Sequence, residues 1–330
     1  MKIWQKILAA MLALLCTALP ACAEFDDMED LDYWYEQLYM LSEEIGMRYV
    51  GYEGELAAMD YVRGEFERLG FSSENGTLKA YDVSNSEAKD LEAILPAAAS
   101  TEPDILIVCA HYDSCYPWVG GELCGARDNA SGVAAMLSMA REFAAMPAYE
   151  STELRFVAFT SEETGHQGSQ AYVESLSQEE LDRIVGVFNL DLTTVDIWLM
   201  DHVFSCDTMG MRTPDGYVEG TDEAPAVNKV ARAVMAAIEE LEYFDPSENG
   251  ITHCVPRNLG MSDHEPFHFA GVDAANIAFR GNVEEGGNWH PYMHTVKDTL
   301  GDLDYERTYQ LLNIVYTALE QLAEDSSYGD

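Results

Sequence analysis

Basic side chains are scarce in this sequence. Of its 330 residues only 18 are Lys or Arg, against 59 Asp or Glu, and the formal net charge is -41 at pH 7. A surface this acidic repels the phosphates of nucleic acids and of anionic lipids. The composition therefore argues against a nucleic-acid-binding protein and favours a charged surface that attracts cations or basic peptides.

Long apolar runs are also missing beyond the first residues. No stretch after residue 23 approaches the ~20 apolar residues that span a bilayer, so we expect no transmembrane segment. Residues 1–23 join a positively charged start, an apolar run and the sequence Ala-Cys-Ala. This succession predicts a signal peptide cleaved before Glu24, and a secreted protein. The alternative is a lipid anchor on Cys22, because the residues before it resemble a lipoprotein cleavage site.

Cysteines are few, and no two are spaced as CxxC, which argues against a zinc site made of thiolates. Five of the seven cysteines lie beyond the predicted signal peptide. An odd number in an exported protein leaves at least one thiol unpaired. Cys115 and Cys124 bracket a short loop and are the predicted disulfide. The alternative pair is Cys206 with Cys254.

Short apolar segments alternate with amphipathic ones along the rest of the chain. We predict strands near 78–83, 91–95, 105–110, 154–160, 184–190 and 275–279. The predicted helices lie near 55–69, 130–146, 169–176, 226–241 and 305–322. Strands that are apolar on both faces, separated by helices, indicate an α/β protein with a mixed, mostly parallel sheet between two helical layers, a three-layer α/β/α sandwich. We expect one domain over 24–330, with 196–260 as a possible lid or insertion.

Polar side chains follow three of these strands. His111 and Asp113 come directly after the first, Glu162 and Glu163 follow the second, and Asp191 follows the third. In such folds the functional site lies at the carboxyl ends of the strands. We therefore expect these five side chains to meet at one edge of the sheet.

Two further segments supply the same residue types. Asp128 lies where a loop opens the helix near 130–146, and His294 follows the last predicted strand. Two histidines and three carboxylates suit zinc, and one shared carboxylate would hold two ions about 3.5–4 Å apart. The candidate metal ligands are His111, Asp128, Glu163, Asp191 and His294.

Glu162 and Asp113 are the remaining candidates for catalysis. Adjacent residues leaving a strand point in different directions, so Glu163 can bind metal while Glu162 accepts a proton from the attacking water. Asp113 stands two residues after His111. Its carboxylate can hold the second imidazole nitrogen of His111 and thereby select the tautomer.

Six segments together resemble the two-zinc aminopeptidases of the bacterial leucyl aminopeptidase type, metallopeptidase family 28. They occur in the family's order and read AHYDS, GARDNASGVAAML, FTSEETGHQGS, FNLDL, SDHEPF and HTVKDT. The resemblance spans residues 105–299. It implies a zinc-exopeptidase fold, two Zn²⁺ ions, and a substrate peptide or protein with a free amino terminus. The implied reaction is hydrolysis of the amino-terminal peptide bond by a water activated by the ions and a Glu base.

The resemblance also implies a role for each candidate residue. Asp128 would bridge the two ions, and the peptide bond that follows it would be cis. One ion would be completed by His111 and Asp191, and the other by Glu163 and His294. Glu162 would be the general base and Asp113 would support His111. Arg127 departs from the family, which usually has an acid at this position.

Other functions remain open on the same residues. The segment from His264 to His268 fits the HExxH zinc-helix motif, but Pro266 disfavours a regular helix around Glu265. A glutaminyl-peptide cyclase shares the implied fold, and relatives within the family act as carboxypeptidases or dipeptidases. A non-catalytic binding protein is a further alternative, against which the complete set of ligands and Glu162 argues.

Overall fold

A central sheet organises the computed structural model, which describes residues 29–116, 121, 123–199, 203–241, 251, 254–281 and 291–326. The predicted signal peptide, Cys22 and the cleavage site before Glu24 lie outside these residues. Within the described ranges, none of the helices combines the length and the apolarity that a bilayer span needs.

The sheet has eight strands in the order β1-β2-β4-β3-β5-β10-β6-β9. Its four central strands, β4, β3, β5 and β10, are parallel, whereas β1, β2 and β6 run antiparallel to a neighbour. The strands are β1 Leu78–Asp82, β2 Lys89–Leu95, β3 Asp104–His111, β4 Thr152–Phe159, β5 Ile184–Leu190, β6 Val203–Thr208, β9 Val255–Asn258 and β10 Ala274–Arg280. The mixed sheet predicted from the alternation of segments is confirmed.

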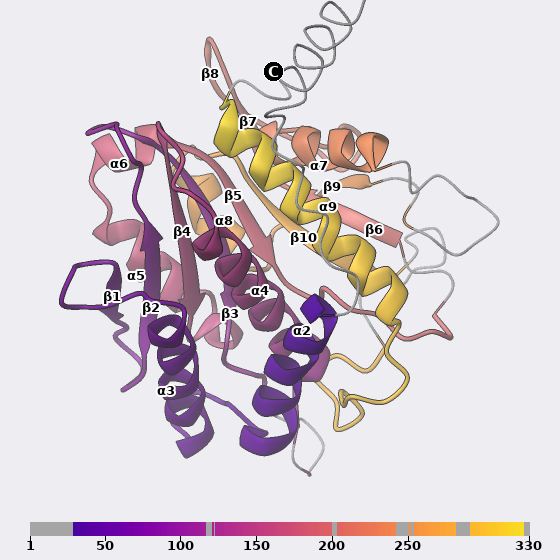
Figure 1. Ribbon diagram of the computed structural model, residues 1–330. Helices are drawn as coiled ribbons and strands as arrows, with labels where there is room; N and C mark the ends of the chain where they lie inside the picture. The colour runs from indigo at the N-terminus through magenta and orange to yellow at the C-terminus, as the bar shows by residue number, and fades with distance from the viewer. Residues whose placement is uncertain are drawn as a thin grey trace, which may run out of the picture.

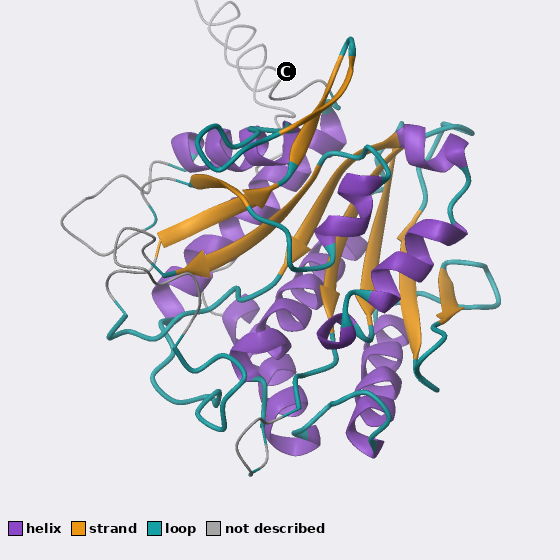
Figure 2. Ribbon diagram, turned by 180° about the vertical axis from the view of Figure 1, so that it is seen from behind, coloured by secondary structure: helices purple, strands orange, loops and turns teal. Residues whose placement is uncertain are grey.

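Helices cover both faces of this sheet (Figures 1 and 2). One layer holds α2 Glu29–Tyr39, α3 Glu53–Arg68, α4 Ser131–Ala145, α7 Lys229–Glu240 and α9 Tyr305–Glu324. The other holds α5 Gln167–Ser175, α6 Gln178–Arg183 and α8 His264–Phe269. The strands between them are apolar on both faces because each face packs against a helical layer. The three-layer α/β/α sandwich is therefore confirmed.

The described part of 196–260 belongs to the body of the fold. β6 and β9 extend the main sheet, and α7 packs against α9. Only the hairpin of β7 (Gly210–Thr213) and β8 (Gly216–Glu219) forms a separate small sheet, and it projects from the sandwich in Figure 2. The described part of this segment, predicted as a possible lid or insertion, is thus built into the sheet and a helical layer.

The predicted disulfide between Cys115 and Cys124 is not formed in the structure. The backbone carbonyl of Cys124 accepts a hydrogen bond of 2.7 Å from Arg48, while the side chain of Cys115 lies beside Glu163 and His294. The two cysteines therefore face different surroundings despite their short separation along the chain. In the alternative pair, the Cys206 and Cys254 sulfur atoms are 2.6 Å apart.

Candidate metal centre

Three neighbouring parallel strands bring the first group of site residues together. His111 is the last residue of β3, and Asp191 comes directly after β5. Glu162 and Glu163 lie in the short 3-10 turn Glu162–Thr164 that follows β4. β4 and β5 pair with β3 in parallel on either side, so their carboxyl ends reach the same edge. The sheet topology alone thus brings these side chains near one another.

Asp128 reaches this edge from the loop that precedes α4. The backbone N–H groups of Arg127 and Asp128 donate hydrogen bonds of 2.8 and 3.1 Å to the two carboxylate oxygens of Asp298. The Asn129 side chain donates to the Leu190 carbonyl at the end of β5, at 2.8 Å. The peptide bond between Asp128 and Asn129 is cis, as the resemblance implies.

The first ligand group consists of His111, Asp128 and Asp191. His111 Nε2 lies 3.4 Å from Asp128 Oδ1 and 3.8 Å from Asp191 Oδ1. Both His111 Nε2 and Asp191 Oδ1 are buried, and neither has a hydrogen-bond partner among the described residues. Buried polar atoms are normally paired, so these two atoms are suited to bind a cation.

The second group consists of His294, Glu163 and the other oxygen of Asp128. His294 Nε2 lies 3.1 Å from both Asp128 Oδ2 and Glu163 Oε2. The second carboxylate oxygen of Glu163, Oε1, is buried and lacks a hydrogen-bond partner within the described part of the chain. Asp128 therefore directs one oxygen to each histidine, which is the arrangement required of a carboxylate that bridges two ions.

These donor atoms fit two divalent cations. Imidazole nitrogen and carboxylate oxygen are the donors that zinc accepts besides thiolate sulfur. The donor atoms of the first group lie within 4.8 Å of one another, and in the second group the carboxylates of Asp128 and Glu163 each lie 3.1 Å from His294 Nε2. The four carboxylates of Asp128, Glu162, Glu163 and Asp191 lie close together and repel one another unless protons or cations neutralise them.

Asp113 joins the two halves of the site. Its carboxylate accepts the backbone N–H groups of Glu162 and Glu163, at 3.1 and 3.2 Å. His111 Nδ1 lies 3.4 Å from Asp113 Oδ1 and 3.2 Å from the Asp113 carbonyl oxygen. A proton on Nδ1 leaves the lone pair of Nε2 directed toward Asp128 and Asp191. One buried carboxylate thus orients both the imidazole and the turn that carries the glutamates.

Burial and crowding shift the pKa values of the acidic groups. Burial raises the pKa of Glu162 well above its usual value, the attraction of His111 lowers it, and repulsion by Glu163 and Asp191 raises it further. Burial and the charge of Asp128 raise the pKa of Glu163 to about 7. Burial also acts on Asp128, but hydrogen bonds with His111 and His294 lower its pKa. The metal-free cluster therefore holds protons where bound cations would favour carboxylates.

A cavity of about 430 Å³ opens beside this cluster. It is lined by Asp128, Glu162, Glu163, Gly165, His166, Asp191, Met261, Met293 and His294. Every candidate metal ligand lines the cavity except His111, which is fully buried. A substrate in this space would contact the acidic groups and the two methionine side chains.

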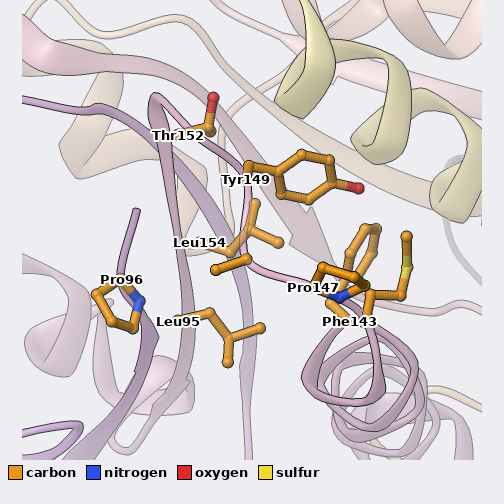
Figure 3. Close-up of a pocket in the computed structure, with 9 residues that line it drawn as sticks. Leu95, Pro96, Phe143, Pro147, Tyr149, Thr152 and Leu154 are labelled. Atoms are coloured by element: carbon orange, nitrogen blue, oxygen red, sulfur yellow. The ribbon is translucent and has the colours of Figure 1, made fainter. Parts of the chain in front are cut away.

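A smaller, apolar cavity lies at the other end of the strands (Figure 3). It measures about 90 Å³ and is lined by Leu95, Phe143, Tyr149 and Leu154, among others. Thr152, which also lines it, begins β4, whereas the site glutamates follow the end of that strand. It brings together none of the candidate ligands.

Arg127, the departure from the family pattern, has its charge neutralised within the fold. Its side chain is buried and pairs with Asp196 and with Asp298, and Asp298 Oδ1 is 3.3 Å away. The carbonyl oxygens of Thr299 and Gly301 accept further hydrogen bonds from it. No sequence pattern predicts a role for Asp298, although it lies in the HTVKDT segment.

Two other groups beside the site were missed. His166 Nδ1 lies 2.9 Å from Glu265 Oε2, and its Nε2 lies 3.5 Å from Glu162 Oε1. Arg48 is buried and donates to the carbonyl oxygens of Tyr112 and Gly125, which joins the segment after β3 to the loop before α4. A lone His or Arg carries no periodic signal, and these contacts join residues far apart in the chain.

The HExxH motif does not form a metal site in the described structure. Both histidines lie in α8, but His264 Nε2 is 2.8 Å from the Leu259 carbonyl oxygen. His268 Nδ1 is 3.0 Å from the Tyr217 hydroxyl. The two imidazoles thus have separate partners, and the segment contributes to packing at the edge of the site.

Comparison with known proteins places this geometry in a family. Residues 92–319 match the model of Peptidase family M28. Aminopeptidase YwaD of Bacillus subtilis is 32% identical over 243 residues, which cover 74% of this chain and 46% of that protein. The chain thus spans about half the length of this relative.

Solved structures with the same fold include enzymes of two kinds. BSAP, a zinc aminopeptidase from Bacillus subtilis, superposes with a TM-score of 0.72 at 20% identity and covers 91% of this chain and 97% of its own. The glutaminyl cyclase of Tannerella forsythia superposes with a TM-score of 0.63 at 19% identity and covers 89% of this chain and 98% of its own. At these identities the structures support the fold, and the family follows from the sequence match. The chain belongs to Peptidase family M28.

Proposed function

We propose that this protein is a zinc aminopeptidase that cleaves the amino-terminal peptide bond of peptides or proteins by means of two zinc ions. The observation that carries this proposal is the bridging geometry of Asp128, whose two oxygens face His111 and His294. Asp191 and Glu163 complete the two groups, and Glu162 lies beside both. Similarity to an aminopeptidase of Bacillus subtilis supports the same reaction.

In this proposal the ligand residues bind the metal ions, and Glu162 transfers the proton. Zinc ions, when bound, polarise a carbonyl oxygen and lower the pKa of water. Glu162 has no place in either ligand group, and its Oε2 lies 3.9 Å from His111 Nε2. Its carboxylate accepts the proton of the attacking water and delivers it to the leaving amine. His111, held by Asp113, and the ligand carboxylates keep their positions during this transfer.

Charge favours the amino end of a substrate. The chain carries a formal charge of -41, and two divalent ions in the site neutralise only a small part of it. This field attracts an ammonium group and repels a free carboxylate. An aminopeptidase therefore fits the site better than a carboxypeptidase does, and a dipeptidase requires a second group that holds the substrate's carboxylate.

Glutaminyl cyclisation is the second candidate, because a glutaminyl cyclase shares the fold. A panel of aminoacyl chromogenic amides, with free and with blocked amines, separates the two reactions when a peptide with amino-terminal Gln is added. We expect hydrolysis of the free-amine substrates and its loss after chelation. Formation of a pyroglutamyl peptide without hydrolysis of the panel would favour the cyclase instead.

Export belongs to the same proposal. We infer from the signal-like residues 1–23 that the mature chain begins at Glu24 and is exported. Mass spectrometry of protein from its native host tests this. Intact Met1 would contradict export, and a lipid on Cys22 would replace the secreted form by an anchored one.

A further inference from the structure

Cys115 lies inside the metal site although no motif marks it. Its side chain is only 8% exposed, and its Sγ, a carboxylate oxygen of Glu163 and a ring nitrogen of His294 all lie within 4.8 Å of one another. Cys115 thus adjoins the two residues that would hold the second ion together with Asp128.

A second observation, on the Glu163 carboxylate, also indicates a cation beside Cys115. The Glu163 side chain is 5% exposed, and its Oε1 is buried with no hydrogen-bond partner in the described part of the chain. A buried carboxylate oxygen of this kind points to a cation. Around one zinc ion, bonds of about 2.3 Å to sulfur and about 2.0 Å to nitrogen and oxygen place ligand atoms roughly 3–4 Å apart. The three atoms need to move only slightly to reach such an arrangement.

We propose that Cys115 supplies a sulfur ligand to the ion held by Glu163 and His294. This inference rests on the proposed two-ion function and adds a ligand to it. On coordination the thiol becomes a thiolate, and its proton passes to solvent. The two ions then differ: the ion of His111 and Asp191 has nitrogen and oxygen ligands, whereas the other has nitrogen, oxygen and sulfur.

A sulfur ligand changes which cations the second position prefers. Thiolate binds zinc and cobalt well and manganese or magnesium poorly, whereas carboxylates accept them all. Removal of the sulfur therefore weakens zinc binding at one of the two positions and leaves the other unchanged. We expect a loss of at least about 10–100-fold in affinity, the size found when partners around a metal are removed.

Cobalt substitution of the full chain tests the inference without an activity assay. A thiolate on cobalt produces a charge-transfer absorption in the near ultraviolet, separate from the visible bands that all bound cobalt shows. We expect this absorption in the wild-type protein and in the control variant Cys124→Ser, which alters a thiol of the same loop. In Cys115→Ser the absorption disappears while the visible bands remain.

The outcomes are distinct. Two bound cobalt ions without a charge-transfer band, or a band that persists in Cys115→Ser, would overturn the sulfur ligand and leave the two-ion function standing. Failure of the wild-type protein to bind cobalt or zinc would overturn both together. If Cys115→Ser does not fold, X-ray absorption of the zinc-loaded wild-type protein decides alone, because a sulfur shell near 2.3 Å is required.

Discussion

Glu162 and Glu163 are neighbours in the chain, yet their carboxylates contact different partners. Glu163 Oε2 lies 3.1 Å from His294 Nε2, whereas Glu162 Oε1 lies 3.5 Å from His166 Nε2. Asp113 holds both backbone N–H groups, so the turn is oriented before any substrate arrives. The proposed ligand and the proposed base thus contact different partners within one turn.

Replacement of these glutamates distinguishes their roles. Glu162→Gln keeps the size of the side chain and removes its basicity, and loss of a general base lowers turnover by about 10²–10⁴-fold. We expect the upper end of this range, with two metal ions still bound. Glu163→Gln is the matched variant and is expected to lose metal. Metal analysis and turnover of both proteins give the answer, and the opposite pattern would reverse the assignment.

Asp263 gives the metal-free protein a predictable pH dependence. It is fully buried, and burial raises its pKa from 3.8 to about 6. The folded state binds this proton more tightly than the unfolded state does, so stability falls as pH rises from about 4 to 6. The shift of about two pKa units corresponds to about 3 kcal/mol.

Asp263→Asn removes this dependence because the side chain no longer ionises. Denaturant unfolding of both metal-free proteins at pH 4 and pH 7 is the measurement. We expect the variant to gain about 3 kcal/mol relative to the wild type between these two pH values. Parallel pH profiles for the two proteins would contradict the assignment.

At the scale of elements, the site depends on how closely α4 approaches the end of β5. Asn129 donates to the Leu190 carbonyl, and its own side-chain oxygen accepts the Gly132 N–H at 3.0 Å. A Cβ on Gly132 would lie 2.0 Å from the Leu190 carbonyl oxygen and 2.3 Å from Asn129 Oδ1. Glycine is required here because two backbone segments meet.

Gly132→Ala is therefore expected to push the loop before α4 away from β5. Asp128 and Asp191 would separate, so the variant should bind metal more weakly and lose stability. Gly64→Ala is the control, since Gly64 lies within α3 and a Cβ there meets nothing within 4 Å. That substitution should stabilise the protein by about 0.5–1 kcal/mol. Calorimetric metal titration and thermal unfolding test the pair, and equal metal affinity would refute the prediction.

At the scale of the whole molecule, the buried carboxylates link metal binding to folding. A ligand that binds only the folded state adds about 2.7 kcal/mol of stability when its concentration is 100 times its dissociation constant. Chelation should therefore lower the unfolding temperature, and zinc should restore it. Scanning calorimetry with and without chelator at pH 7 measures this. An unchanged unfolding temperature after complete metal removal would argue against sites formed by the folded cluster.

Local patterns were sufficient to predict the central layers of the fold. Strands β3, β4, β5 and β10 were predicted within one or two residues of their observed bounds. Short runs that are apolar throughout are typical of strands covered on both faces, which makes such strands easy to recognise. Strand β6 and its neighbour β9 at the edge of the sheet were missed. They lie in the segment interpreted as a lid or insertion, and short strands of this kind lack a continuous apolar run.

The residue types at the strand ends can be recognised from the chain alone, and they define the candidate set from His111 to His294. The tertiary structure decided what surrounds them. Asp298, Cys115 and the pair of His166 with Glu265 reach the site from separate segments. The local hydrophobic pattern of the sequence does not predict such contacts, because they arise only when distant parts of the chain pack together. The family match identifies a kind of site, whereas burial and packing set its individual chemistry.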